Sequence, residues 1–248
     1  MLMEKTKFEL NALTLHILAM FCMLLDHMWA TVVSGQYWMT CVGRLAFPIF
    51  AFMIAEGFFR TSDLKKYLLR LFVFAVLSEI PFNLMSGGSL LYPYHQNVLW
   101  TFLIALLAMT AMEKIRQKQK FLLSVVSTAG ITVLACFLGL VTMTDYNAAG
   151  VFMVLLFYFF RGRTWKHFLG QFIGLYWVNV LVIGGMDIPL SLFGTEFFLP
   201  SQAFALLALL PIWLYRGKQG PHNKAIQYAC YAFYPVHILL LGLMGIWG

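Results

Sequence analysis

Residues 24–59 read LLDHMWATVVSGQYWMTCVGRLAFPIFAFMIAEGFF, and this stretch decides the fold. It predicts two apolar helices joined by a polar turn, which together form a membrane hairpin. Four ionisable side chains interrupt it: Asp26, His27, Arg44 and Glu56. An ionisable group at membrane depth costs about 2.5–3.5 kcal/mol on insertion scales, so such groups are usually kept for a function. The hairpin therefore predicts both a membrane fold and a polar site inside it.

The composition extends this interpretation to the whole chain. Of its 248 residues, 61% are hydrophobic and 11% are charged, whereas a soluble domain carries about 25% charged residues. We therefore expect an all-α, polytopic integral membrane helical bundle, built as a single domain over residues 1–248 and surrounded by membrane lipid. We place it in the cell membrane.

The charge and the cysteines exclude other classes of function. The net charge of +7 comes from short loops between apolar runs, which favours topology signals over nucleic-acid binding, so no nucleic-acid partner is expected. The four cysteines are scattered without the spacing of metal ligands, and three of them lie inside apolar runs. We expect no disulfide and no metal site.

Apolar runs predict about nine membrane spans, since each span needs about 20 apolar residues. The runs cover residues 12–33, 40–59, 64–85, 96–112, 121–143, 148–160, 168–185, 201–215 and 225–247. The sixth run is short for a span. With the N-terminus inside, nine spans place the C-terminus outside and leave only Arg44, of the 17 Lys and Arg residues, on the outer side. This segregation supports the count, because cytoplasmic loops carry an excess of Lys and Arg.

Polar residues converge on one layer in the outer half of the predicted bundle. At about 1.5 Å of rise per residue, His27 and Arg44 come to a similar depth on neighbouring spans. The other features expected near this level are Glu79, His95, Asn97 and Asp145. Any one of them could be an interhelical hydrogen bond, but the whole set favours a functional site. His237, in the last span, is either a second polar group that reaches this site or a helix–helix hydrogen bond.

The Asp26-His27 pair has two possible uses. A carboxylate can fix the tautomer of a histidine that acts as a general base. Neighbours on a helix point about 100° apart, however, so Asp26 can instead pair with Arg44. Glu56 lies deeper, near the cytoplasmic face, and is expected to pair with a basic residue there.

Two cationic turns lie on the predicted inner side. Residues 215–221, YRGKQGP, combine two glycines with two cations, and residues 60–70, RTSDLKKYLLR, are also basic. Such turns could hold phosphates through backbone N–H groups and charge, although a simple topology signal has the same composition. Together with the outer polar layer they suggest a passage across the membrane.

At this point the sequence resembles the TraX family, integral membrane proteins named for the conjugative F-pilin acetylase. Its second-span signature is similar to residues 43–71, GRLAFPIFAFMIAEGFFRTSDLKKYLLRL. Asp26-His27, the stretch around Asn97 and residues 78–83, 215–220 and 231–237 also resemble the family, so the similarity runs essentially from end to end. The family is similar in turn to a wider superfamily of membrane acyltransferases that O-acetylate envelope sugars.

The resemblance implies an acetyl-CoA-dependent acetyltransferase, with cytoplasmic acetyl-CoA as the donor. The acceptor would be an amine or hydroxyl on the outer side, a pilin N-terminus or an envelope glycan. His27 maps onto the expected first-span catalytic histidine and would act as base or acyl carrier, with Asp26 and Arg44 beside it. The residues expected to bind the acceptor are Glu79, His95, Asn97, Asp145 and His237, and those expected to bind CoA are Lys66, Arg70, Arg216 and Lys218.

Two other classes of function remain open at this stage. A secondary transporter or lipid-linked flippase could use the same polar layer as its substrate site, although we find no internal repeat of the kind that many transporters have. A structural membrane scaffold would leave the buried charges unexplained. Neither the acceptor nor the oligomeric state can be inferred from the sequence.

Overall fold

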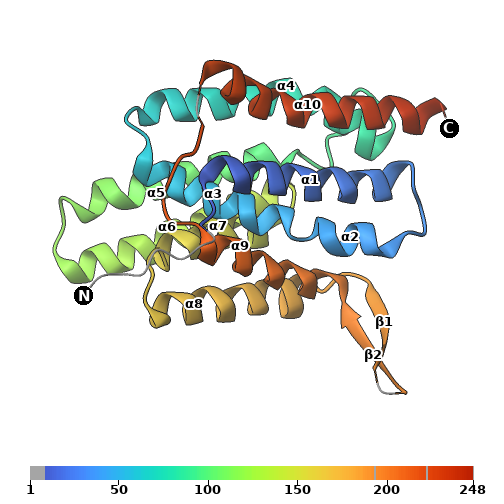
Figure 1. Cartoon of the computed structure of the whole chain (residues 1–248). Coiled ribbons are helices and arrows are strands. Elements are labelled where there is room, and N and C mark those ends of the chain that lie inside the picture. Colours follow the sequence, from blue (N-terminus) through green and yellow to red (C-terminus); the bar gives the residue numbers. More distant parts are fainter. Residues whose placement is uncertain (1–8, 193, 222, 248) are drawn as a thin grey trace.

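The computed structural model describes residues 9–192, 194–221 and 223–247. Its helices run side by side along one axis (Figure 1). In chain order the elements are α1 (Ala12–Thr31), α2 (Tyr37–Gly43), α3 (Ala46–Arg60), α4 (Leu64–Gly87), α5 (Val98–Arg116), α6 (Phe121–Val141), α7 (Asn147–Phe159), α8 (Trp165–Tyr176), the π-helix η1 (Trp177–Ile183), β1 (Asp187–Leu192), β2 (Thr195–Pro200), the 3₁₀-helix η2 (Ser201–Ala208), α9 (Leu209–Leu214) and α10 (Lys224–Trp247).

Side-chain caps fix where several of these helices begin. The side chains of Asn11, Asp63 and Asn97 accept hydrogen bonds from backbone N–H groups in the first turns of α1, α4 and α5. Each cap satisfies one of the amides that have no partner within the helix. At the other end of α4, Gly88 takes a left-handed conformation with φ of 62°, which glycine adopts without strain. Polar residues at the edges of the apolar runs therefore set the helix lengths.

The core lies where α3, α5 and α7 meet, with α1 packed against α2 and α3. Its fully buried side chains are almost all aliphatic or methionine, such as Ile49, Leu106 and Met153. Helix α10 packs along α4, and the two form a layer above the rest of the bundle in Figure 1. Gly242 allows this close approach, because a Cβ there would lie 2.9 Å from the backbone nitrogen of Met85.

The bundle is that of a multi-pass membrane protein. Six helices are long and apolar enough to cross a bilayer: 12–31, 37–60 (α2 with α3), 64–87, 98–116, 121–141 and 224–245. Helix α6 leaves large apolar side chains such as Val133 and Phe137 exposed, as expected of a surface that faces lipid tails. The other three predicted spans fall on the 13-residue α7, on α8 continued by η1, and on η2 continued by α9. The all-α bundle is confirmed, and the count of nine spans stays a prediction.

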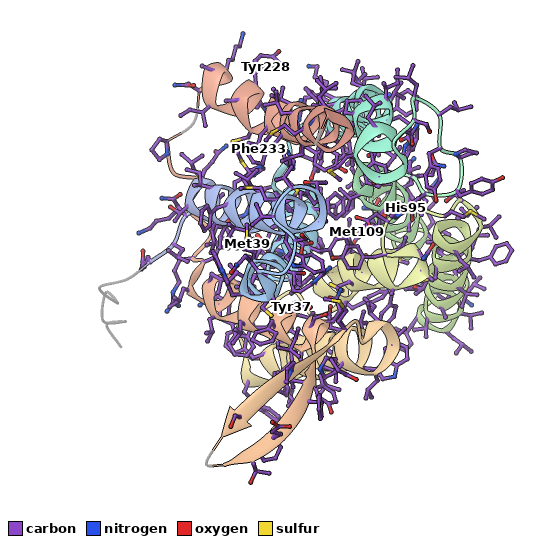
Figure 2. All side chains as sticks on the ribbon, turned by 90° about the vertical axis from the view of Figure 1, so that its right-hand side faces the viewer. Tyr37, Met39, His95, Met109, Tyr228 and Phe233 are labelled. Atoms are coloured by element: carbon purple, nitrogen blue, oxygen red, sulfur yellow. The ribbon has the colours of Figure 1, made fainter. Side chains whose placement is uncertain are left out.

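One segment departs from the all-helical expectation. β1 and β2 pair as an antiparallel hairpin, from Asp187 opposite Pro200 to Leu192 opposite Thr195. Gly194, with φ of 78°, allows the chain to reverse between the strands. The hairpin projects beyond the helices in both Figure 1 and Figure 2. Each strand has only six residues. A strand is recognised in a sequence by alternating apolar and polar residues, and six residues are too few for that alternation to stand out in so apolar a chain.

The two ends of the bundle differ in charge. The Lys- and Arg-containing segments at the ends of α3, α5, α7 and α9 (residues 60–66, 116–120, 160–164 and 215–221) lie toward the left in Figure 1, and we call this the basic end. The turns at residues 32–36, 88–97 and 142–146 form the far end, where Gln96 and Thr144 join two of them in a β-bridge. Along the chain, turns with Lys and Arg at one end therefore alternate with turns without them at the other, as the sequence predicts.

Candidate functional site

A polar cavity of about 290 Å³ lies toward the far end. Helix α1 contributes Asp26 and His27, and Arg44 stands at the bend between α2 and α3. The loops at the far end contribute His95 and Asp145. These five predicted site residues come from segments far apart in the sequence and line one space, which agrees with the expected polar layer.

Asp26 and Arg44 are linked through Thr40. The Thr40 hydroxyl donates to Asp26 Oδ1 at 2.7 Å and accepts from an Arg44 Nη at 2.7 Å. The same Arg44 nitrogen lies 3.4 Å from Asp26 Oδ1, and both side chains are 19% exposed. Gly43 makes this approach possible, because a Cβ there would lie 2.4 Å from Asp26 Cβ. Of the two uses open to Asp26, the structure shows the pairing with Arg44.

Tyr146 adds an aromatic wall to the cavity. Its left-handed backbone, with φ of 61°, begins the turn into α7, and its ring stacks on Phe47 with the centroids 4.2 Å apart. The phenol also lies near the Arg44 guanidinium. Burial raises the pKa of Tyr146 to about 12, although the positive charge of Arg44 acts to lower it, so the hydroxyl keeps its proton at neutral pH.

His27 meets His237 across the interface between α1 and α10. His27 Nδ1 lies 2.8 Å from His237 Nε2, and His237 Nδ1 lies 2.8 Å from the carbonyl oxygen of Phe233. His237 is only 6% exposed. It is not among the described residues that line the polar cavity, whereas His27 is. The helix–helix hydrogen bond expected of His237 is thus present, and the side chain that it joins to His237 is His27, the predicted catalytic histidine.

His95 and Asp145 form a second pair at the outer edge of the cavity. His95 Nε2 lies 3.4 Å from Asp145 Oδ1, and the two side chains are 42% and 29% exposed. The hydrogen bond to Asp145 raises the pKa of His95 above that of a free imidazole. This pair is the part of the site that is most open to solvent.

Glu79 and Asn97 lie together but outside the described walls of the polar cavity. Asn97 donates to Glu79 and, at 2.9 Å, to the carbonyl oxygen of Ala75. The indole of Trp100 donates to the same Glu79 oxygen at 2.9 Å. These bonds tie α4 to the start of α5, so the two residues hold helices together beside the cavity.

At the basic end, a cavity of about 580 Å³ is lined by Glu56, Arg60, Arg70, Tyr215 and Gly217, among others. Glu56 accepts from Arg60 Nε at 2.8 Å and from Arg161 Nε at 2.7 Å, which confirms the basic partner expected for it. The Nε of Arg70 is buried and has no hydrogen-bond partner within the described ranges. An unpartnered buried donor in a cavity wall is a group that a ligand can satisfy.

A neighbouring cavity of about 250 Å³ shares Glu56 and Arg60 and adds Arg161, Arg163 and Arg216. Of the four predicted CoA-binding cations, Arg70 and Arg216 therefore line these cavities. Lys66 pairs with Asp63 at 3.0 Å and is 75% exposed, and Lys218 pairs with Glu9. Neither lysine is among the described residues that line either cavity.

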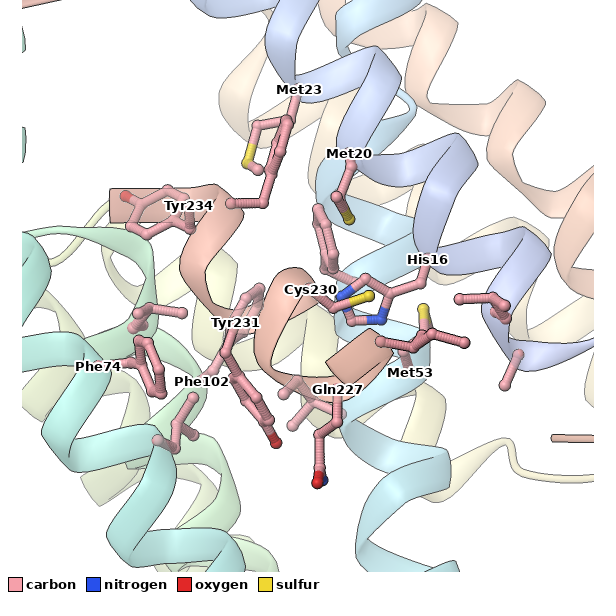
Figure 3. A pocket seen from close by; sticks show the side chains of 18 of the residues that line it. His16, Met20, Met23, Met53, Phe74, Phe102, Gln227, Cys230, Tyr231 and Tyr234 are labelled. Atoms are coloured by element: carbon pink, nitrogen blue, oxygen red, sulfur yellow. The ribbon is translucent and has the colours of Figure 1, made fainter. Parts of the chain in front are cut away.

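An apolar cavity of about 260 Å³ (Figure 3) adjoins both the basic-end cavity and the polar cavity. In Figure 3, His16 on α1 and Cys230 on α10 point toward one another, and Tyr231 on α10 lies on the side of Phe74. The apolar cavity shares wall residues with the cavity on each side. Those in common with the basic-end cavity are Ala12, Met53, Tyr67, Gln219 and Tyr231, and those in common with the polar cavity are Met23, Phe50, Val98, Phe102 and Tyr234.

Sequence reasoning missed several residues that line these cavities or support their walls. Thr40 and Tyr146 bear no charge, and Arg161 and Arg163 have the composition of ordinary topology signals. Arg60 belongs to the basic turn at residues 60–70, but only Lys66 and Arg70 of that turn were expected to bind CoA. Thr40 could have been found from its position one helical turn before Arg44, since that spacing brings the two side chains together. Within the described ranges, no three His, Cys, Asp or Glu side chains lie close enough to hold a metal ion together.

The fold and its cavities define a multi-pass membrane protein with a polar site buried between its helices. A profile of the family described as TraX protein matches residues 12–245, and the chain belongs to this family. It is also similar to a protein of Dichelobacter nodosus described as "Probable fimbrial assembly protein FimC, serogroup H1". The two are 28% identical over 253 residues, which cover 94% of this chain and 95% of that protein. No solved structure matches the chain.

Proposed function

We propose that the chain is a membrane-embedded acetyltransferase that moves an acetyl group from acetyl-CoA to an acceptor at the far end. The basic end would face the cytoplasm, as its Lys and Arg residues favour. The observation that carries the proposal is the series of three cavities between the basic-end arginines and His27, in which the apolar cavity shares wall residues with each of the other two. A long substrate with an anionic head and a reactive tail fits such a series.

The anionic head of CoA would lie at the basic end. Arg70 offers an unpartnered buried Nε there, and Arg216 stands across the neighbouring cavity. Arg60 and Arg161 are already paired with Glu56, and two cations on one carboxylate leave net positive charge for a phosphate. Arginine suits this task because its planar fork can bind phosphate oxygens in pairs.

The pantetheine arm would occupy the apolar cavity. Along α1, Ala12 marks the boundary with the basic-end cavity and Met23 marks the boundary with the polar cavity. They are eleven positions apart along the helix, which is about 16.5 Å at about 1.5 Å per residue. That length is close to the roughly 15 Å of half a bilayer core, which the arm can span.

At the polar cavity, His27 would remove the proton from the acceptor's amine or hydroxyl group. The acceptor atom then bonds to the thioester carbonyl carbon, the carbon–sulfur bond breaks, and the departing thiolate takes the proton back from His27. Arg44 would stabilise the negative charge that develops on the carbonyl oxygen. Its Nε is buried without a hydrogen-bond partner among the described residues, so it is free to donate.

A fimbrial protein is the acceptor that we favour over an envelope glycan. The support is the name of the Dichelobacter nodosus relative, a probable fimbrial assembly protein that is similar over nearly its whole length. The amine or hydroxyl would approach past His95 and Asp145, the more exposed side chains of the polar cavity.

The experiment is release of the CoA thiol by the purified full chain given acetyl-CoA. It is run with water alone, with a peptide that has a free α-amine, and with a hydroxyl-bearing envelope sugar. His27→Gln keeps a hydrogen-bonding side chain but removes the base, and we expect thiol release to fall about 10²–10⁴-fold. His167→Gln is the matched control, because His167 lies on the surface and bonds only to Thr164 within the described residues.

Equal activity of the His27→Gln variant and the parent would overturn the assignment of the base. A second outcome is that the parent releases no thiol with any of the three acceptors and yet moves a substrate across a vesicle membrane. That result would overturn the acetyltransferase proposal in favour of a transporter. Both outcomes leave the fold and the cavities unchanged.

A further inference from the structure

His237 is a buried titratable group that the proposed reaction does not yet use. It lies behind His27 as seen from the polar cavity, since His27 lines that cavity and His237 is 6% exposed. Both nitrogens of its ring have partners, one on α1 and one in its own helix. A side chain so enclosed has no polar atom left for a substrate.

The two imidazole rings meet edge to edge. Their planes are only 6° apart and their centroids are 5.0 Å apart. That separation equals the 2.8 Å between the nitrogens plus roughly one ring radius on each side, so the rings lie nearly in one plane rather than face to face. A hydrogen bond in the ring plane points along the nitrogen lone pair, which is its best geometry.

The partners also fix where the protons are. The Phe233 carbonyl oxygen can only accept, so His237 Nδ1 carries a proton. A neutral imidazole has one protonated nitrogen, so His237 Nε2 is the acceptor and His27 Nδ1 is the donor. Both rings are neutral, because a buried charge is costly without a partner and the nearby Asp26 carboxylate is bound by Thr40 and Arg44.

We infer that His237 is a positioning residue that holds His27 as the Nδ1–H tautomer and leaves His27 Nε2 unprotonated. The inference rests on the proposed function for its use in acetyl transfer, and it specifies which nitrogen of His27 acts. When Nε2 takes the acceptor's proton, the Nδ1–H bond to His237 becomes charge-assisted and strengthens. His237 thereby does for His27 what a buried carboxylate does for the histidine of a hydrolase triad.

Helix α10 is well placed to hold His237 steady. It packs along α4, and at Gly242, about one and a half turns beyond His237, the two helices are so close that a Cβ would lie 2.9 Å from the backbone nitrogen of Met85. The ring of His237 is also stacked on Phe233, with the centroids 4.6 Å apart. The imidazole is therefore fixed by its own helix before it meets His27.

The first arm of the test reads the tautomer directly and needs no activity. Nitrogen-15 NMR of the full-length, histidine-labelled protein should show His27 with a protonated Nδ1 and an unprotonated Nε2, and a through-hydrogen-bond coupling between His27 Nδ1 and His237 Nε2. In His237→Leu, the coupling should vanish and His27 should become a mixture of tautomers. A parent protein with the proton on His27 Nε2 would overturn the inference.

The second arm compares His237→Leu with His237→Gln, using thiol release from acetyl-CoA with water or the α-amine peptide as acceptor. Gln can still accept the His27 Nδ1–H bond, so we expect its turnover to stay within about tenfold of the parent. Leu cannot, and a misplaced tautomer lowers turnover by up to about 10⁴-fold. The KM for either substrate should stay within about twofold in both variants.

A rise in KM at unchanged turnover would instead make His237 a substrate ligand and overturn the inference. If the parent releases no thiol while the NMR arm finds the expected tautomer, the proposed function fails and the proton assignment of the two histidines stands.

Discussion

Arg44 and Arg70 each present a buried Nε without a hydrogen-bond partner among the described residues, yet their surroundings differ. Arg44 lines the polar cavity beside His27 and is tied to Asp26 both directly and through Thr40. Arg70 lines the wider basic-end cavity, where Arg60 provides a second cation and the adjoining space provides more. Each charge of the polar cavity has one dedicated partner, whereas the basic end carries several similar cations. Single substitutions should therefore be severe in the first region and graded in the second.

The sharpest test of this comparison sets Arg44→Gln against Arg70→Gln. If Arg44 stabilises developing charge as proposed, its loss should lower turnover about 10²–10³-fold. Loss of Arg70 should raise the KM for acetyl-CoA while turnover at saturation changes little, because ground-state binding is lost. Steady-state thiol release at varied acetyl-CoA measures both. Similar kinetic profiles for the two variants would remove the distinction between the regions.

Gly43→Ala tests how tightly the polar cavity is built. The added methyl group would lie 2.4 Å from Asp26 Cβ, so α1 and α2 must separate or Asp26 must move. We expect a loss of about 1–3 kcal/mol in stability, as for other overpacked sites, together with reduced activity. Gly130→Ala on α6 is the control, since nothing lies within 4 Å of its Cβ position. There we expect unchanged or slightly higher stability, measured by thermal unfolding in the same detergent.

Charge reversal at Arg216 and Lys218 sharpens the comparison within the basic end. Arg216 lines the arginine-rich cavity, whereas Lys218 pairs with Glu9. Arg216→Glu should raise the KM for acetyl-CoA about tenfold, the equivalent of about 1.4 kcal/mol. Lys218→Glu should raise it only about two- to threefold. Direct measurement of CoA binding by both variants is decisive. If Arg216→Glu binds CoA as the parent does, the turn at residues 215–221 serves only as a topology signal.

The smallest effect is expected at the outer edge of the polar cavity. Because the pKa of His95 is raised by its bond to Asp145, the ion pair is fully present below about pH 6.5 and is lost as pH rises through the raised pKa. Its contribution to stability is at most about 1 kcal/mol, since both side chains are partly exposed. His95→Gln should therefore lower the unfolding temperature more at pH 6 than at pH 9. A pH-independent difference would show that the pair carries no charge.

Much of the fold and part of the site could be predicted from the sequence. Hydropathy locates the long helices, because apolar runs of that length are typical of membrane spans. The turns that carry Lys and Arg gather at one end of the bundle, as the sequence pattern predicts. The hairpin stretch and helical rise are enough to bring Asp26 and Arg44 together. The β-hairpin and the π-helix were not predicted, because neither has a periodicity that survives in so apolar a chain.

The relation between the two histidines was beyond the reach of the sequence. Their ring nitrogens lie 2.8 Å apart although 210 positions separate them along the chain. Helical spacing gives the depth of a residue in the membrane, but not the direction in which its helix turns the side chain. It therefore cannot distinguish a residue that lines a cavity from one that lies behind the cavity wall. For the same reason, the sequence analysis placed Glu79 and Asn97 with the polar cavity. Their hydrogen bonds instead join α4 to α5 beside it.

The contact between His27 and His237 has a consequence for the timing of synthesis. A ribosome that adds about 5–20 residues per second completes His237 roughly 10–40 s after His27. During that interval α1 can already lie in the membrane, but the imidazole that orients its histidine does not yet exist. If the proposed function holds, the nascent chain gains full activity only once α10 has been inserted, and any transcript cut short before that helix yields a membrane protein without the completed pair.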